Sequence, residues 1–75
     1  MEAITRAEHV RWCKARAREY VNAGALGDAV ASMLSDLGKH EATAELASSI
    51  GMIGIMAAAS GDRGRVSRFI EGFAE

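Results

Sequence analysis

The clearest pattern of hydrophobic positions runs through residues 26–37. Apolar side chains recur there at steps of three and four, at Leu26, Ala29, Val30, Met33, Leu34 and Leu37. This spacing places them on one face of an α-helix. Gly24 precedes the segment and Gly38 follows it, and glycine is the residue that most often ends a helix. The sequence therefore predicts an amphipathic helix between two glycines.

A helix with a more modest apolar face is predicted before it. Thr5 and Glu8 have the spacing of a capping box, so this helix should begin near Arg6 and end at Gly24. Its apolar face carries Val10, Cys13, Ala17, Tyr20 and Val21. The two helices are expected to pack as an antiparallel hairpin with Tyr20 and Met33 between them. The hairpin resembles a tetratricopeptide helix pair, because five of the hairpin's residues have the spacing of that repeat. They are Ala17, Tyr20, Gly24, Ala29 and Met33.

Residues 46–60, which follow a connector at residues 39–43, are apolar on nearly every side when wound as a helix. No charged residue lies between Glu45 and Asp62. A helix without a polar stripe must be covered by neighbouring helices, by a second copy of the chain, or by lipid. The uncharged run is shorter than the roughly 20 apolar residues that a bilayer span requires. A central apolar helix that ends at Gly61 is therefore expected, covered either by its own chain or by a second copy.

Small residues line one ridge of this helix, at Ala47, Gly51, Gly54 and Ala58. Such a ridge lets another helix backbone approach closely, within the chain or from a second copy. Each interior glycine lowers helix stability by about 1 kcal/mol, so the packing gained must offset that loss. The ridge is therefore a candidate site of close packing or self-association.

Asp62 is placed to cap a last helix. The apolar stripe of this helix consists of Val66, Phe69, Ile70 and Phe73, and its outward-facing cations are Arg63, Arg65 and Arg68. The chain is thus predicted to be a single all-α domain, residues 1–75, in which about four short helices form a compact bundle.

A chain of 75 residues has little core, since folding at this size buries about 60% of the unfolded surface. A single cysteine cannot form an internal disulfide, and no Cys/His cluster has the spacing of zinc ligands. Self-association, most simply as a homodimer, is the expected supplement. Charged residues interrupt any apolar run near the N-terminus, so no signal peptide or membrane span is expected and the protein should be cytoplasmic.

The residue pattern does not indicate catalysis. Ser48 and Ser49 have no base beside them, and His9 with Cys13 would supply two metal ligands where a structural zinc site needs four. Cys13 lies on the apolar face and is better explained as a small buried hydrophobe. We expect a protein that is not an enzyme and that has no metal and no cofactor.

Two sets of residues are candidates for binding a partner. Trp12 and Arg16 lie off the apolar face and have the composition typical of interface anchors, although packing of Trp12 against the third or fourth helix is favoured over a partner-binding role. Together with the last helix they give a candidate protein-binding set of Trp12, Arg16, Arg63, Arg65 and Arg68. The alternative is nucleic-acid binding along a basic stripe of Arg11, Lys14 and Arg18. Such a stripe is more often a solvated face, and the net charge of −1 makes any such binding weak and sensitive to salt.

Three stretches point to a setting for the chain: WCKARAREYV at residues 12–21, SMLSDLGKH at residues 32–40 and RFIEGF at residues 68–73. At these stretches the chain resembles small uncharacterised proteins encoded by phages and prophages of actinobacteria. The resemblance covers most of the chain and implies no activity or catalytic residue. It implies an accessory protein in the host cytoplasm that binds a host protein, for example to inhibit a host process or defence system.

Overall fold

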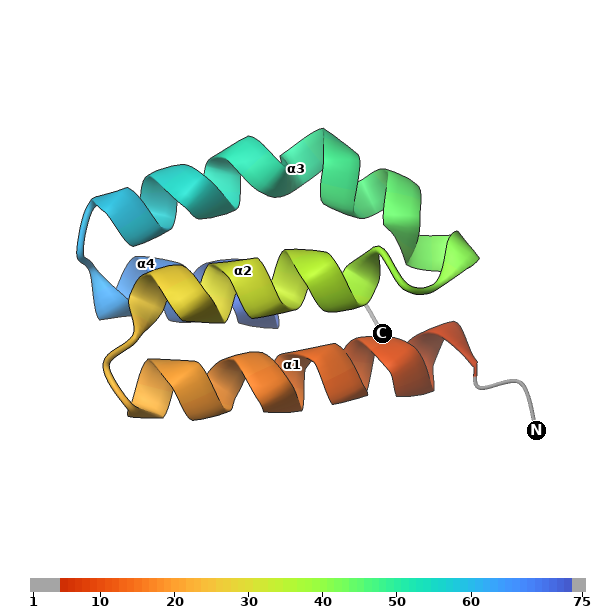
Figure 1. Cartoon of the computed structure of the whole chain (residues 1–75), viewed down its shortest axis with the longest axis horizontal. Helices are drawn as coiled ribbons and strands as arrows, with labels where there is room; N and C mark the ends of the chain where they lie inside the picture. Colours follow the sequence, from red (N-terminus) through yellow and green to blue (C-terminus); the bar gives the residue numbers. More distant parts are fainter. Residues whose placement is uncertain (1–4, 74–75) are drawn as a thin grey trace.

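The computed structural model describes residues 5–73, without the side chain of Ala42, and this part of the chain forms four α-helices and no strand (Figure 1). They are α1 (Arg6–Asn22), α2 (Leu26–Leu37), α3 (Glu41–Ala59) and α4 (Arg63–Glu71). The predicted all-α bundle is confirmed.

Helix ends lie where local signals predicted them, with one exception. Thr5 Oγ1 accepts a hydrogen bond from the Glu8 backbone N–H at 3.1 Å, and the Glu8 carboxylate accepts one from the Thr5 backbone N–H. The capping box is therefore present. Gly24 has a φ of 79° and Gly61 a φ of 70°, a region that glycine adopts without strain. Asp62 Oδ1 accepts from the backbone N–H groups of the first turn of α4 at 2.8 and 3.2 Å.

The exception is the connector expected at residues 39–43, because α3 already begins at Glu41. The side chain of Thr43, in the first turn of α3, is fully buried, and its hydroxyl donates to the Leu37 carbonyl at 2.6 Å. This bond satisfies a carbonyl at the end of α2, which has no partner within its own helix. The two helices therefore follow each other more closely than the sequence predicted.

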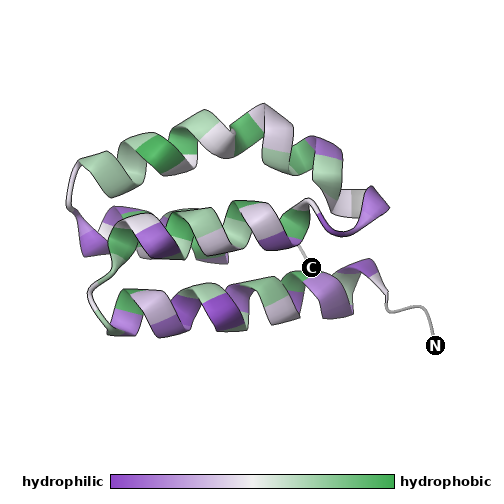
Figure 2. Cartoon of the chain, viewed as in Figure 1, coloured by the Kyte–Doolittle hydropathy of each residue, from purple (hydrophilic) through white to green (hydrophobic). Residues whose placement is uncertain are grey.

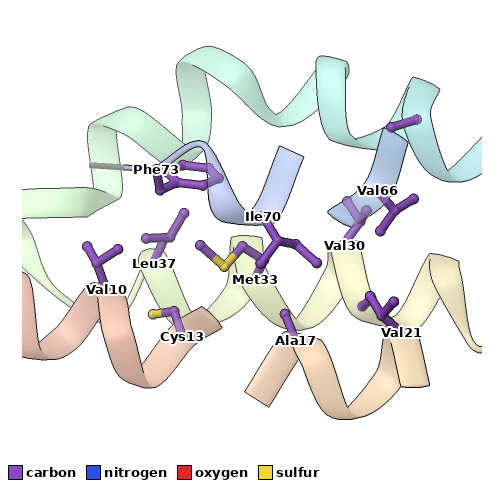
Figure 3. Packing of buried hydrophobic residues seen from close by; sticks show 12 residues of the cluster. Val10, Cys13, Ala17, Val21, Val30, Met33, Leu37, Val66, Ile70 and Phe73 are labelled. Carbon is purple, nitrogen blue, oxygen red and sulfur yellow. The ribbon is translucent and has the colours of Figure 1, made fainter. Parts of the chain in front are cut away.

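The central helix is α2, and the prediction that the apolar third helix is central is wrong. In Figure 1, α2 lies between α1 and α3, with α4 behind it. Figure 3 shows Met33 of α2 beside Ile70 of α4 and Leu37, and all three side chains are fully buried. Among the described residues, α3 adds Ala57 as its one buried apolar side chain. A helix that is apolar on all sides can turn only one face to the core. The other faces of α3 are exposed at the surface of the bundle.

The small-residue ridge is the face of α3 that packs against its own chain. A Cβ atom placed on Gly54 would lie 2.6 Å from Phe69 Cζ of α4 and 3.0 Å from Val30 Cγ1 of α2. Ala47 and Ala58 are partly buried against the same core. Close packing within the chain therefore accounts for this ridge.

Tyr20 does not lie between α1 and α2 as predicted, since it is 39% exposed. Ala17 and Val21, both buried, already fill the space against α2. The tyrosine ring lies at the rim, where it lines a shallow pocket with Arg16 and Asp28. The resemblance of this helix pair to a tetratricopeptide stays a prediction.

The two glycines of the ridge give a matched test of this packing. Gly51→Ala should stabilise the fold by up to about 1 kcal/mol, because alanine favours a helix and the nearest atom, Leu34 Cδ1, is at an ordinary 3.6 Å. Gly54→Ala gains the same propensity but forces the Phe69 ring aside, and overpacking costs about 1–3 kcal/mol. Urea unfolding should find Gly54→Ala the less stable variant by that amount; equal stabilities would contradict the packing.

Candidate functional site

The buried carboxylate of Asp36 joins α1 to the end of α2. Asp36 is 1% exposed, and its two oxygens accept hydrogen bonds from Arg16 Nε at 2.6 Å and Lys39 Nζ at 3.0 Å. Burial opposes ionisation of this carboxyl, but the hydrogen bonds from Lys39 and Arg16 outweigh it and hold the pKa of Asp36 below its ordinary value. The charged carboxylate therefore fixes the positions of both cations.

His9 makes a second link to the same helix end. It is buried, and its Nε2 lies 2.8 Å from the Asp36 carbonyl oxygen. A carbonyl oxygen only accepts, so Nε2 carries the proton and donates it. Cys13 Sγ lies 3.6 Å from the same nitrogen. Side chains from α1 and α3 thus satisfy the carbonyls of Asp36 and Leu37 at the end of α2.

Trp12 lies on top of this polar cluster. Its ring stacks on His9 at a centroid distance of 5.8 Å, and His9 stacks in turn on His40 at 4.9 Å. Arg16 Cζ lies 5.0 Å from the Trp12 ring centroid and Lys39 Nζ lies 5.6 Å from it, within range of cation–π attraction. Trp12 is nevertheless 43% exposed. We call this group the tryptophan site: His9, Trp12, Arg16, Lys39 and His40.

The Cys13 thiol beside this site is not activated as a nucleophile. Burial, reinforced by the charge of Asp36, raises the pKa of the Cys13 thiol to about 11, so the thiol is protonated at neutral pH. Within residues 5–73, no three His, Cys, Asp or Glu side chains gather as metal ligands. What the site offers is a partly exposed indole ring with two positive charges close to it, an arrangement with room for an apolar side chain together with a carboxylate.

The predicted protein-binding set is divided between two surfaces. Trp12 and Arg16 belong to the tryptophan site, whereas Arg65 and Arg68 line a groove between α3 and α4. Arg63 contacts Asn22 of α1 at 3.3 Å. Sequence reasoning missed the roles of Asp36, Lys39 and the two histidines. The available signal was the spacing of His9, Trp12 and Arg16 at i, i+3 and i+7, which places them on one helix face.

The basic stripe of α1 is partly engaged within the fold, because two of its three cations contact α4. Lys14 is 5% exposed, and its Nζ donates to the Glu71 carbonyl at 3.2 Å. Arg18 donates to both carboxylate oxygens of Glu71, at 2.5 and 2.6 Å, and this pairing lowers the pKa of Glu71. The carbonyls at a helix C-terminus attract cations, which explains the burial of Lys14. The alternative of nucleic-acid binding through Arg11, Lys14 and Arg18 therefore gains no support from the fold.

A second exposed surface lies on α3. Figure 2 shows this helix as polar at its N-terminal end and apolar or neutral beyond it. The side chains of Met52, Ile53, Ile55 and Met56 are between 55% and 66% exposed, and we call them the α3 face. An apolar patch of this kind on a small protein is often functional. No helix within residues 5–73 combines the length and apolar character needed to span a bilayer.

Comparisons with known proteins add nothing to this geometry. No family model, no curated protein and no solved structure matches the chain. The tryptophan site and the α3 face are therefore the two observations that bear on function.

Asp36 should make the fold sensitive to acid. The pKa of its carboxyl is lower in the folded chain than in the unfolded one, so its contribution is complete above the unfolded value of about 3.9 and is lost as the pH falls through the folded value. Asp36→Asn should lower the free energy of unfolding at pH 7 by about 1–3 kcal/mol, since Arg16 and Lys39 lose a charged partner but remain partly solvated.

Urea unfolding at pH 7 and pH 3 measures both effects. The loss of stability between the two pH values should be smaller in Asp36→Asn than in the native chain. Glu19→Gln, which changes an exposed carboxyl of α1, is the control and should behave as the native chain does. An equal loss in Asp36→Asn and the native chain would show that Asp36 does not control acid stability.

Proposed function

We propose that this chain is a non-catalytic protein that acts by binding another protein, and that the partner docks on the tryptophan site. The observation that carries the proposal is the exposure of Trp12 on top of a buried, charged cluster. Tryptophan and arginine are the residues most enriched among the side chains that dominate binding energy at interfaces. A Trp–Arg pair held in place on a helix is such an anchor.

The fixed geometry of the cluster supports tight binding. Nε of Arg16 and Nζ of Lys39 are both bound to Asp36, so the two long side chains lose little freedom when a partner arrives. Side chains that are ordered in advance lower the entropic cost of association. The complementary partner surface has an apolar or aromatic side chain next to a carboxylate, which would face the two cations. Since the chain has a net charge of −1, this attraction acts locally.

The biological setting of the proposal comes from the resemblance of residues 12–21, 32–40 and 68–73 to small proteins of actinobacterial phages and prophages. In that setting the chain is an accessory protein in the host cytoplasm and its partner is a host protein. By binding through the tryptophan site, the chain would cover the surface that the host protein uses for its own contacts and so inhibit that protein.

A matched pair of variants on α1 tests the proposal. Trp12 and Tyr20 are both aromatic and similarly exposed, at 43% and 39%, but only Trp12 belongs to the tryptophan site. A partner captured from host lysate is first identified, and its affinity for each variant is then measured by calorimetry. Trp12→Ala should weaken binding by about 2 kcal/mol or more, roughly 30-fold, whereas Tyr20→Ala, which changes a residue beside Arg16 but outside the tryptophan stack, should have a much smaller effect.

Thermal melting must show that both variants remain folded. Arg16→Lys should give an intermediate loss, because lysine keeps the charge but loses the planar contact with the indole ring. An identified partner that binds Trp12→Ala as tightly as the native chain would exclude the tryptophan site as the docking surface.

A further inference from the structure

We infer that the α3 face binds a second copy of this chain, in a symmetric dimer in which the two α3 helices run antiparallel. This inference goes beyond the proposed function, because the tryptophan site lies on α1 and the turn after α2, whereas the dimer uses α3. Its basis is the composition, the extent and the charge pattern of the exposed side of α3.

The exposed apolar area fits an interface of moderate size. Four side chains that are 55–66% exposed present on the order of 400 Å² of apolar surface. Each partner of a standard protein complex buries about 800 Å². The groove beside the α3 face supplies further area, since it is lined by Ala57, Phe69 and the stems of Arg65 and Arg68. Long arginine stems cover apolar surface while their charged ends stay in water.

The positions of the α3 face are symmetric about residue 54. When two such helices cross antiparallel with residue 54 at the twofold axis, Met52 of one copy comes opposite Met56 of the other. Ile53 and Ile55 lie on opposite flanks of this line, so each faces the same isoleucine of the partner. A twofold interface requires this self-complementarity, because the same patch serves both copies. Methionine side chains are flexible enough to fill the remaining gaps.

Charge selects the antiparallel orientation. Residues 46–61 carry no charge, so the centre of the interface brings no like charges together. Glu45 lies on the same helical line as Met52 and Met56, nine residues before the axis. Near the other end of α3, Arg65 of α4 lines the groove and forms an ion pair with Asp62 at 3.8 Å. The antiparallel crossing brings Glu45 of each copy towards Arg65 of the other. A parallel crossing would place the two Glu45 side chains together, and like charges repel.

Sedimentation equilibrium of the full chain, from about 1 µM to about 100 µM, tests the inference over the range of ordinary homodimer affinities. The native chain should have the mass of a dimer at the upper end. The double variant Met52→Glu with Met56→Glu should be monomeric throughout, with the dissociation constant raised at least about tenfold. Ala31→Glu, at an exposed position of α2, is the control and should dimerise as the native chain does. Circular dichroism checks that all variants remain helical.

A charge exchange tests the orientation. Glu45→Arg alone and Arg65→Glu alone should each weaken the dimer, and the two together should restore it. A double variant that fails to recover overturns the antiparallel arrangement.

A native chain that stays monomeric at about 100 µM, or a dimer unaffected by the two glutamates, overturns the dimer itself. The same holds if the α3 face variants lose binding to a different protein or to lipid vesicles while the native chain stays monomeric. Trp12→Ala should still dimerise, so failure of the dimer and failure of the tryptophan site can be told apart.

Discussion

The rest of the structure depends on the packing of α2 against all three other helices. Met33 and Leu37 have no exposed surface because α1, α3 and α4 together enclose them. Each outer helix therefore turns one side to α2, and its remaining sides face water or a partner. For α1 and α4 this arrangement suits the sequence, since their outer sides carry charged residues. For α3 it does not, because its outer side is apolar between residues 52 and 56. The exposed face of α3 is thus a direct consequence of which helix is central.

Polar side chains of α1 add to the packing of its modest apolar face, because they bind the ends of α2 and α4. His9 and Arg16 bind the end of α2 through Asp36, while Lys14 and Arg18 bind the end of α4 through Glu71. In both places the α1 side chains reach a helix C-terminus, where backbone carbonyls lack partners within the helix and the dipole is negative. The same contacts hold Trp12 in position, because three of the groups around its ring, those of His9, Arg16 and Lys39, are bound to Asp36. Structural and binding roles are therefore combined in one helix.

The sequence was sufficient where the signal is local and insufficient where it is not. Thr5, Gly24 and Asp62 act on atoms within a few residues, and the helix ends they predict are confirmed. By contrast, the bond between His9 and Asp36 joins positions 27 apart, and the bond between Lys14 and Glu71 joins positions 57 apart. No pattern along the chain marks such partners. For the same reason the apolar run of α3 predicts a central helix, which the structure does not have: its hydrophobicity shows that it must be covered and does not show by what.

The arrangement of the two surfaces bears on how they would act together. Since α1 and α3 lie on opposite sides of α2, pairing through the α3 face would leave both tryptophan sites of a dimer open (Figure 1). Such a dimer would present two identical anchors on its outer sides. Two linked sites bind a partner that is itself a dimer far more tightly than one site does, because the second contact forms within the complex at high effective concentration. A small chain with one modest binding site would thereby reach high affinity, because the dimer uses two copies of that site at once.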